Sequence, residues 1–297
     1  MSQFKSGFIA IMGRPNVGKS TLMNQLVGEK VAIISHKPQT TRHQIRGILN
    51  GDDYQMVFID TPGLHKPKSR LGEFMVKSAL SALEEVDAAI VVVDASEEIG
   101  TGDRAAIESL KDTKTPVVLV LNKIDKIEKN QLLALIDGFQ GIPYIREIIP
   151  MSALKGDGAE DLLKVLESFL EEGPKYFPED MYTDQPERVI VAEMIREKTL
   201  HLLRDEIPHG IGVEILSMEQ IREDMVEIHA NLMCERQSHK PIIIGKRGSM
   251  LKEIGTKSRH DMEKLLGSRI NLQLWVKVVP DWRNKTAIMR DLGYHEG

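Results

Sequence analysis

The most chemically specific stretch of the sequence is a glycine-containing loop near its amino terminus. It fits the pattern G-x-x-x-x-G-K-[ST] and consists of Gly13, Arg14, Pro15, Asn16, Val17, Gly18, Lys19 and Ser20. The glycines let backbone N–H groups turn toward a phosphate, Lys19 supplies positive charge, and the Ser20 hydroxyl is a ligand for Mg²⁺. An apolar strand pattern precedes the loop and a helical pattern follows it, so residues 13–20 and Thr21 are predicted to bind a nucleoside triphosphate.

A second short motif, Asp60, Thr61, Pro62 and Gly63, directly follows another apolar strand pattern. The Asp60 carboxylate can hold Mg²⁺ through a water, and the Gly63 N–H can sense a γ-phosphate. The alternative is a plain turn, since Pro and Gly mark turns. The position at a strand end favours the functional interpretation, which makes Lys19 and Gly63 candidate catalytic residues.

Two further strand ends supply candidates for binding the base. These are Asn122, Lys123, Asp125, Ser152, Ala153 and Leu154. The Asp125 carboxylate can accept the adjacent N1–H and N2–H₂ donors of guanine, whereas adenine would leave this charge unpaired. The Lys123 stem can cover the face of the base, and a backbone N–H of residues 152–154 can reach guanine O6. The order of the four motifs therefore predicts a guanine nucleotide site.

The elements that must position these motifs follow an alternating pattern. Strands are predicted at Gly7–Met12, His43–Asn50, Tyr54–Asp60, Ala88–Asp94, Pro116–Asn122 and Arg146–Ser152, with helical patterns such as Ser78–Val86 and Gly102–Asp112 between them. Several strands are apolar throughout, as expected when both faces of a parallel sheet are covered. Asn50-Gly51 indicates a hairpin and one antiparallel edge strand. The fold class predicted for residues 1–172 is a doubly wound, mostly parallel α/β P-loop domain.

Residues 173–187 are predicted to link two domains, because Pro174, Pro178 and Pro186 interrupt the pattern there. Residues 188–297 are predicted to form a smaller α+β domain. Its expected elements are a helix near 187–206, strands near 212–218 and 225–236, a helix at 249–266 and a strand at 269–279.

A second glycine loop, Gly245-Lys246-Arg247-Gly248, separates an apolar turn at Pro241–Ile244 from the basic helix. Residues 240–290 hold twelve Lys/Arg and four Asp/Glu, a net charge of +8 that leaves −13 for the rest of the chain. A GXXG loop in this α-β-β-α-α-β order resembles the type II KH arrangement, which clamps single-stranded nucleic acid. The predicted RNA-binding residues are Ile244, Gly245, Lys246, Arg247, Gly248, Lys252, Lys257 and Arg259. Ile242, Ile243 and Ile244 are expected to form an apolar floor, whereas Trp275 is expected to be in the core or half-buried.

The composition is ordinary for a globular protein, with 297 residues, 41% of them hydrophobic, and a formal net charge of −5. The single Cys234 excludes an internal disulfide framework, and we expect a reducing compartment. The first thirteen residues are not expected to be a signal peptide, and no apolar run is long enough to span a membrane.

With these motifs in place, the first domain resembles translation-factor-class GTPases. GRPNVGKS, QTTRH, DTPGLHKP and NKID followed by IIIGKRGSMLKEIG make the whole chain similar to the Era family of bacterial GTPases. The resemblance implies that residues 39–42 form the first switch and that a threonine there ligates Mg²⁺ and completes the catalytic set. Thr41 is favoured over Thr40. It also implies that Asn16 helps to hold a K⁺ ion. Leu64 stands where Ras-type enzymes have a water-orienting glutamine, which leaves His65 as one candidate.

The family resemblance implies a cytoplasmic GTPase that takes GTP/GDP, Mg²⁺ and in some cases K⁺. It implies binding to the 3′ end of 16S rRNA, a role in maturation of the 30S subunit, and peripheral contact with the inner membrane face; a monomer is expected. Two alternatives remain open at this point. One is a membrane-associated GTPase in cell-cycle control, and the other is an RNA chaperone that uses GTP only as a sensor.

Overall fold

The computed structural model describes residues 4–37, 39–64, 66–84, 86–204 and 207–294. These residues form two compact units. The first contains residues up to Ile34, Thr41–Lys66 and Met75–Asp184, and the second contains Ser35–Thr40, Pro67–Phe74 and the chain from Gln185 onward. The sequence placed a linker at 173–187, whereas the chain packs with the first unit as far as Asp184. Among the described residues every helix is too short or too polar to cross a bilayer.

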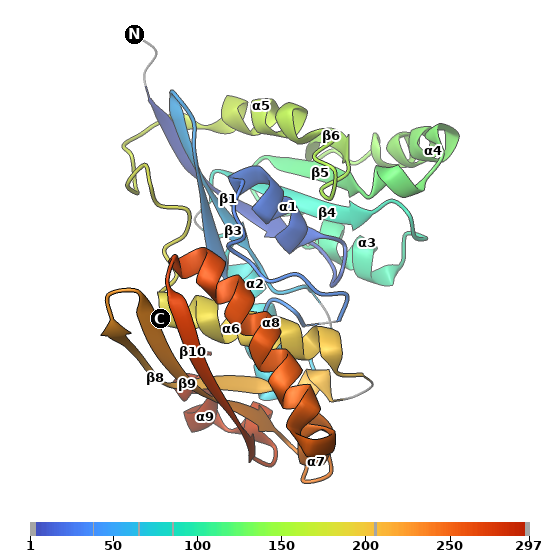
Figure 1. The fold of residues 1–297 in the computed structure, drawn as a ribbon. Helices are drawn as coiled ribbons and strands as arrows, with labels where there is room; N and C mark the ends of the chain where they lie inside the picture. Colours follow the sequence, from blue (N-terminus) through green and yellow to red (C-terminus); the bar gives the residue numbers. More distant parts are fainter. Residues whose placement is uncertain (1–3, 38, 65, 85, 205–206, 295–297) are drawn as a thin grey trace. The chain divides into compact units, whose positions relative to one another are not determined.

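The first unit is a seven-stranded sheet with helices on both faces (Figure 1). Its elements are β1 (Lys5–Met12), α1 (Lys19–Val27), β2 (Ile45–Asn50), β3 (Tyr54–Asp60), α2 (Arg70–Ser81), β4 (Ala88–Asp94), α3 (Thr101–Glu108), β5 (Val117–Asn122), α4 (Lys129–Phe139), β6 (Ile145–Met151), α5 (Ala159–Phe169) and β7 (Glu171–Glu172). The start of α2, up to Phe74, belongs to the second unit. The main order is β2-β3-β1-β4-β5-β6, parallel except for the β2–β3 hairpin, and β7 pairs antiparallel with β1. The predicted fold class and antiparallel edge are confirmed.

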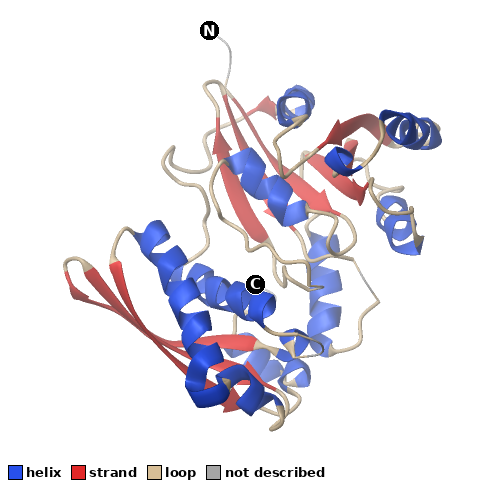
Figure 2. Ribbon diagram, turned by 45° about the vertical axis from the view of Figure 1, so that its right-hand side comes forward, coloured by secondary structure: helices blue, strands red, loops and turns tan. Residues whose placement is uncertain are grey.

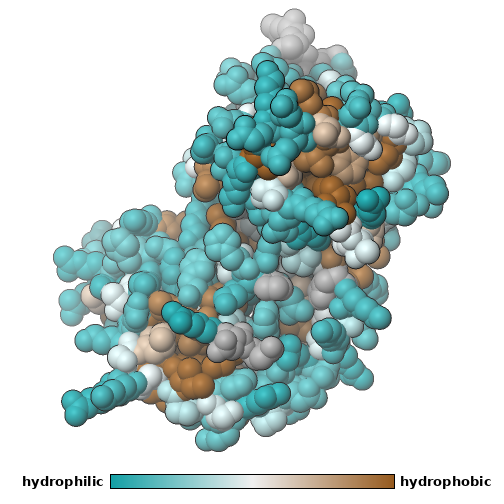
Figure 3. Space-filling model, turned by 90° about the vertical axis from the view of Figure 1, so that its right-hand side faces the viewer, coloured by the Kyte–Doolittle hydropathy of each residue, from teal (hydrophilic) through white to brown (hydrophobic). Residues whose placement is uncertain are grey.

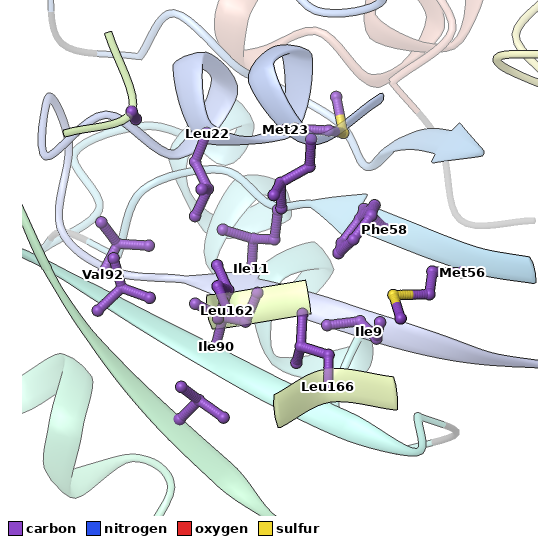
Figure 4. Close-up of a cluster of buried hydrophobic side chains, with 14 of the residues drawn as sticks. Ile9, Ile11, Leu22, Met23, Met56, Phe58, Ile90, Val92, Leu162 and Leu166 are labelled. Atoms are coloured by element: carbon purple, nitrogen blue, oxygen red, sulfur yellow. The ribbon is translucent and has the colours of Figure 1, made fainter. Parts of the chain in front are cut away.

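Alternation along the central strands divides the core between the two faces of this sheet. Ile90 and Val92 of β4 belong to a cluster with side chains of α1 and α5, including Leu22 and Leu162 (Figure 4). The intervening residues of β4 face a second cluster with α3 and α4. Burial on both faces explains why β4 reads as a continuous apolar run. The strand register aligns Asp94 with Asn122, so the chemical motifs meet at one edge of the sheet.

Most predicted boundaries of the first domain are accurate to one or two residues. The strand expected from His43 begins at Ile45. The helical pattern predicted over Ser78–Val86 ends early, because α2 stops at Ser81 and residues 82–84 form a turn, while residue 85 lies outside the described residues. Helix α2 begins at Arg70, eight residues earlier, and ends at Ser81.

The residues of the predicted linker that follow β7 lie against β2 and β3 of the first unit. The Gln55 side-chain oxygen accepts hydrogen bonds from the backbone N–H groups of Tyr176 and Phe177, at 2.8 and 3.0 Å. Further along, the Ile48 N–H donates to the Tyr182 carbonyl over 2.9 Å. The connection is therefore held by specific hydrogen bonds.

The second unit combines a three-stranded sheet with helices across one of its faces (Figure 2). Its elements are α6 (Glu187–Leu202), β8 (Gly212–Arg222), β9 (Met225–Cys234), α7 (His239–Ile244), α8 (Ser249–Leu266), β10 (Arg269–Val278) and α9 (Thr286–Asp291). Strand β9 lies in the centre, antiparallel to β8 and parallel to β10. Alternate residues of β9, Ile228, Ala230 and Leu232, are buried in the core under α6 and α8. The predicted α-β-β-α-α-β order is confirmed.

The surface of both units is largely hydrophilic, with apolar patches between the charged side chains (Figure 3). Trp275 is 45% exposed, which fits the half-buried alternative and not the core. Trp282 is fully buried, and its indole N–H donates to the Gly210 carbonyl over 2.8 Å. Such mixed surfaces are normal for folded proteins, so the sites must be argued from geometry.

Candidate functional site

The loop between β1 and α1 has a backbone that only glycine permits at two positions. Gly13 and Gly18 have φ of 144° and 103°. A Cβ at Gly13 would lie 2.5 Å from the Val92 carbonyl oxygen, and one at Gly18 would lie 2.3 Å from the Asn122 side-chain nitrogen. The G-x-x-x-x-G-K-[ST] spacing thus wraps the loop tightly around the start of α1, with its N–H groups available to a phosphate.

Lys19, the first residue of α1, lies over this loop. Its Nζ donates to the carbonyl oxygens of Gly13 and Arg14, at 3.1 and 2.9 Å. Burial lowers the pKa of the Lys19 ammonium from 10.5 to about 8, with Arg14 adding to the effect and Asp60 opposing it. The ammonium lacks a full counter-charge here, and the phosphates of a nucleotide would supply one.

Three oxygen-bearing side chains meet beside the loop. The Ser20 hydroxyl donates to Asp60 Oδ2 over 2.6 Å, and the Thr41 hydroxyl donates to the same oxygen over 3.1 Å. The two hydroxyl oxygens are 3.0 Å apart. Thr40 lies differently, because its hydroxyl donates to the Lys37 carbonyl over 2.6 Å. The geometry therefore brings Thr41, and not Thr40, to Ser20 and Asp60.

This cluster fits Mg²⁺. Asp60 is fully buried, and its Oδ1 atom has no hydrogen-bond partner among the residues that the structure describes. Burial raises the pKa of the Asp60 carboxyl, against the opposing effects of Lys19, Ser20 and Thr41. A buried carboxylate oxygen without a donor, next to two hydroxyl oxygens, is the hard oxygen environment that Mg²⁺ prefers.

The turn after β3 lies directly against the phosphate loop. A Cβ on Gly63 would lie 2.7 Å from the backbone nitrogen of Pro15, and the Leu64 N–H donates to the Gly13 carbonyl over 3.2 Å. The Thr61 hydroxyl donates to the Ile11 carbonyl over 2.7 Å and fixes the start of the turn. Gly63 therefore lies close enough to the phosphate loop for its N–H to contact a bound phosphate, as predicted. His65, the candidate for orienting water, lies outside the described residues.

The candidate base-binding residues come together at the ends of β5 and β6. The Asn122 side chain donates to the Val17 carbonyl over 2.7 Å and accepts from the Ala153 N–H over 2.9 Å. It thereby ties the phosphate loop to the segment 152–154. The Ser152 hydroxyl donates to Asp125 Oδ1 over 2.7 Å, and this hydrogen bond lowers the pKa of Asp125. The lowered pKa favours the carboxylate form of Asp125, and a carboxylate is suited to accept two N–H groups from guanine.

Lys123 has a partner that the sequence did not indicate. Its ammonium forms an ion pair with Asp94 and donates to the Asn16 carbonyl over 2.9 Å. Burial pushes the pKa of Asp94 upward, but hydrogen bonds from Lys123 and Ser96 bring it below its ordinary value. Asp94 is the last residue of β4, just as Asp60 is the last residue of β3. This shared position at a strand end could have predicted that Asp94 lies at the nucleotide site.

Arg14 anchors the phosphate loop from the opposite side. Its guanidinium donates to Asp103, 2.8 Å away, and pairs with Glu97. The loop is thus tied both to β5 and to the start of α3. Asp103 and Glu97 lie about ninety residues from Arg14 along the chain, so no local pattern predicts this contact.

The second glycine loop is a tight turn between α7 and α8. Gly245 and Gly248 have φ of 75° and 81°, and Arg247 between them is also left-handed, at 53°. A Cβ on Gly245 would lie 2.7 Å from the Met250 backbone nitrogen. Such a turn leaves the backbone bare on one side, where a sugar-phosphate chain can approach closely.

A groove of about 370 Å³ continues from this loop along α8 and β10. It is lined by Gly248, Leu251, Lys252, Gly255, Thr256, Arg259, Leu272 and Leu274. Lys252 and Arg259 therefore lie where the sequence placed them. Lys257 is not among the lining residues and pairs with Glu253 over 2.8 Å.

The apolar floor of this groove differs from the expectation. Ile243 is fully buried in the core of the second unit, and Ile242 is exposed on the outside of α7. The groove is instead floored by Leu251, Leu272 and Leu274. Other groove-lining residues of helix α8 and its cap recur at helical spacing: 248, 252, 255, 256 and 259. The periodicity of α8 could therefore have predicted which face of the helix lines the groove.

Comparison with known proteins agrees with the division into two domains. A family model described as 50S ribosome-binding GTPase matches residues 8–123, and a KH domain model matches residues 206–283. Fold and sites thus define a P-loop GTPase domain followed by a KH domain. The chain is 56% identical over 295 residues to GTPase Era of Clostridioides difficile (strain 630), covering 99% of each chain. It is 55% identical over 292 residues to GTPase Era of Alkaliphilus metalliredigens (strain QYMF), covering 98% of this chain and 99% of the relative. The chain belongs to the Era family of GTPases.

Two solved structures resemble the whole chain. One is Era in complex with MgGDPNP and nucleotides 1506–1542 of 16S ribosomal RNA, with 43% identity and a TM-score of 0.93 over 99% of this chain and 100% of that one. The other is a variant of Aquifex aeolicus Era bound to GDP and AlF₄⁻, with the same identity, coverage and TM-score.

Proposed function

We propose that this GTPase uses GTP to control how its KH groove grips the 3′ end of 16S rRNA, and that it thereby assists maturation of the 30S subunit. The main support for this proposal is that one chain contains both a candidate guanine nucleotide site and a cationic GXXG groove. The similar Era structure that holds both a GTP analogue and 16S rRNA nucleotides supports the pairing of these two ligands.

At the nucleotide site, Lys19 would exchange the carbonyls of Gly13 and Arg14 for the β and γ phosphates. Ser20, Thr41 and Asp60 would hold Mg²⁺, which neutralises charge on the phosphates when bound. Asp125 would select guanine, and Asn122 would keep the phosphate loop and the base-binding loop in register. These contacts position GTP for attack by water.

Hydrolysis needs a further component, because the side chain after Gly63 is Leu64, which cannot orient water through a hydrogen bond. A K⁺ ion held with the help of Asn16 would supply the missing positive charge, in the role of an arginine finger. We expect faster GTP hydrolysis in KCl than in NaCl at equal ionic strength. Equal rates in the two salts would remove K⁺ from the mechanism.

At the RNA site, the GXXG turn would admit the backbone of a single strand while Lys246 and Arg247 neutralise its phosphates. Lys252 and Arg259 would extend this contact along the groove, and its leucine floor would pack against the bases. This combination of apolar floor and bare turn favours RNA over an anionic lipid surface. Peripheral membrane contact, a monomeric state and a cytoplasmic location stay predictions.

The direct test is binding of a labelled single strand with the 3′-end sequence of 16S rRNA, compared with a scrambled strand. Lys246→Glu combined with Arg247→Glu should weaken binding by at least about a hundredfold, since two cations become anions. The same variant should keep its affinity for guanine nucleotides. The proposal fails if the native protein binds both strands equally, or if the charge reversal leaves RNA affinity intact. Absence of GTP hydrolysis by the native protein would favour the sensor-only RNA chaperone.

A further inference from the structure

A buried arginine of the KH unit contacts the backbone of the first switch. Arg196 of α6 is fully buried. Its Nη1 donates to the Gln39 carbonyl over 3.3 Å, and its Nη2 donates to the Thr40 carbonyl. The segment Ser35–Thr40 that carries these carbonyls belongs to the second unit, like α6 itself. The contact therefore lies within one compact unit.

The guanidinium is fixed on its other side by Glu193, one helical turn earlier. Arg196 Nε donates to Glu193 Oε1 over 2.8 Å, and Nη2 pairs with the second carboxylate oxygen. Four hydrogen bonds thus use the planar fork of donors that only arginine provides. A lysine at this position could face Glu193, but it could not reach both carbonyls with the same geometry.

The backbone that Arg196 holds is locally strained. Gln39 has φ of 62°, which a non-glycine residue adopts only when its surroundings support it. Within the same segment, the Thr40 hydroxyl donates to the Lys37 carbonyl and the Ser35 hydroxyl oxygen accepts from the Lys37 N–H over 3.1 Å. Arg196 thus contacts the backbone of the two residues that immediately precede Thr41.

We propose that Arg196 is a positioning residue for the GTP site. By fixing the carbonyls of Gln39 and Thr40, it sets the backbone direction from which the Thr41 hydroxyl reaches Ser20 and Asp60. A threonine at this position would contact Mg²⁺ when the nucleotide carries a γ-phosphate and would lose that contact with GDP. Arg196 consequently stabilises the GTP-bound state selectively over the GDP-bound state. The inference deepens the switch proposed above and rests on it.

The test compares Arg196→Gln with the native full-length chain by titration with a fluorescent non-hydrolysable GTP analogue and with fluorescent GDP. We expect Arg196→Gln to lower affinity for the GTP analogue about tenfold. This loss corresponds to the usual net contribution of a hydrogen bond from a charged donor. Affinity for GDP should stay unchanged, and the Mg²⁺ concentration needed for binding the analogue should rise. Arg196→Lys, which keeps the charge opposite Glu193, should fold if the glutamine variant does not and should show the same selective loss.

Arg188→Gln is the matched control, because Arg188 lies on the same helix and its Nη2 donates to the carbonyls of Ile215 and Leu216 inside the KH unit. This control should leave the preference for GTP analogue over GDP at the native value. An unchanged preference in both Arg196 variants overturns the inference, as does an equal loss in the Arg188 control. If the native protein binds neither nucleotide, the proposed function itself is wrong, and this result is distinct from a failure of the Arg196 inference.

Discussion

At the scale of single residues, the nucleotide site contains two buried ionisable groups whose charges are only partly compensated by their neighbours. Lys19 is buried with a pKa lowered to about 8, and Asp60 is buried with a pKa raised by its burial. Each group would gain a counter-charge from a nucleotide–Mg²⁺ complex, the ammonium from phosphate and the carboxylate from the metal. Because both groups are buried with shifted pKa values, the site should favour a ligand that carries both negative phosphate and a positive metal ion.

The lowered pKa of Lys19 predicts proton uptake on nucleotide binding. Phosphate favours the ammonium and raises its pKa, so the free site binds fewer protons than the occupied site above pH 7, and affinity falls as pH rises through 8. We expect about half a proton taken up at pH 8 and much less at pH 6.5. Calorimetry in two buffers of different ionisation enthalpy measures this quantity. Lys19→Met should abolish the uptake, and equal uptake in that variant would assign the proton to another group.

At the scale of elements, the two glycine loops use the same residue type for different purposes. The first turns N–H groups inward before α1, and the second exposes bare backbone before α8. The two glycines of the second loop are not equivalent. A Cβ at Gly245 would meet the Met250 backbone nitrogen at 2.7 Å, whereas a Cβ at Gly248 would have no neighbour within 4 Å. Only Gly245 combines a left-handed backbone with a steric requirement.

This difference predicts unequal effects of alanine substitutions. Gly248→Ala should lower the free energy of unfolding by about 1 kcal/mol, the usual penalty for a left-handed non-glycine residue. Gly245→Ala should lower it by about 1–3 kcal/mol and weaken RNA binding as well, because the turn itself must shift. Urea unfolding of the two variants measures the comparison. Equal destabilisation would contradict the steric argument.

Most helix and strand bounds could be predicted from the sequence, because they are set by residues within or next to each element. Strands β3 and β4 and helix α8 have the predicted bounds, since apolar runs, turn residues and capping glycines mark their ends. The early start of α2 was missed. Its first N–H, on Arg70, is bonded by the Asn284 side chain over 3.0 Å, a contact 214 residues away. Motif spacing likewise identified Ser20, Asp60 and Asp125, whereas the Arg14–Asp103 and Arg196–Thr40 contacts depend on the folded chain.

At the scale of the whole molecule, the segments next to Thr41 and Gly63 belong to the second unit, whereas Thr41 and Gly63 themselves belong to the first. Ser35–Thr40 precedes Thr41, Pro67–Phe74 follows Gly63, and both segments pack with the KH unit. The Arg70 and Asn284 contact and the Arg196 contacts hold them there. We propose that a ligand that orders Thr41 and Gly63 also affects the neighbouring segments, which pack within the second unit. Such an effect would couple GTP binding to RNA binding.

We propose that the bound nucleotide governs how tightly this protein binds RNA. The affinity of the full-length protein for the 16S rRNA 3′-end strand should be measured at fixed salt with saturating GTP analogue and with saturating GDP. We predict binding about tenfold tighter with the GTP analogue, within the usual range of coupling between sites. By reciprocity, the RNA should raise affinity for the analogue by the same factor. Equal RNA affinity in the two nucleotide states would contradict the account.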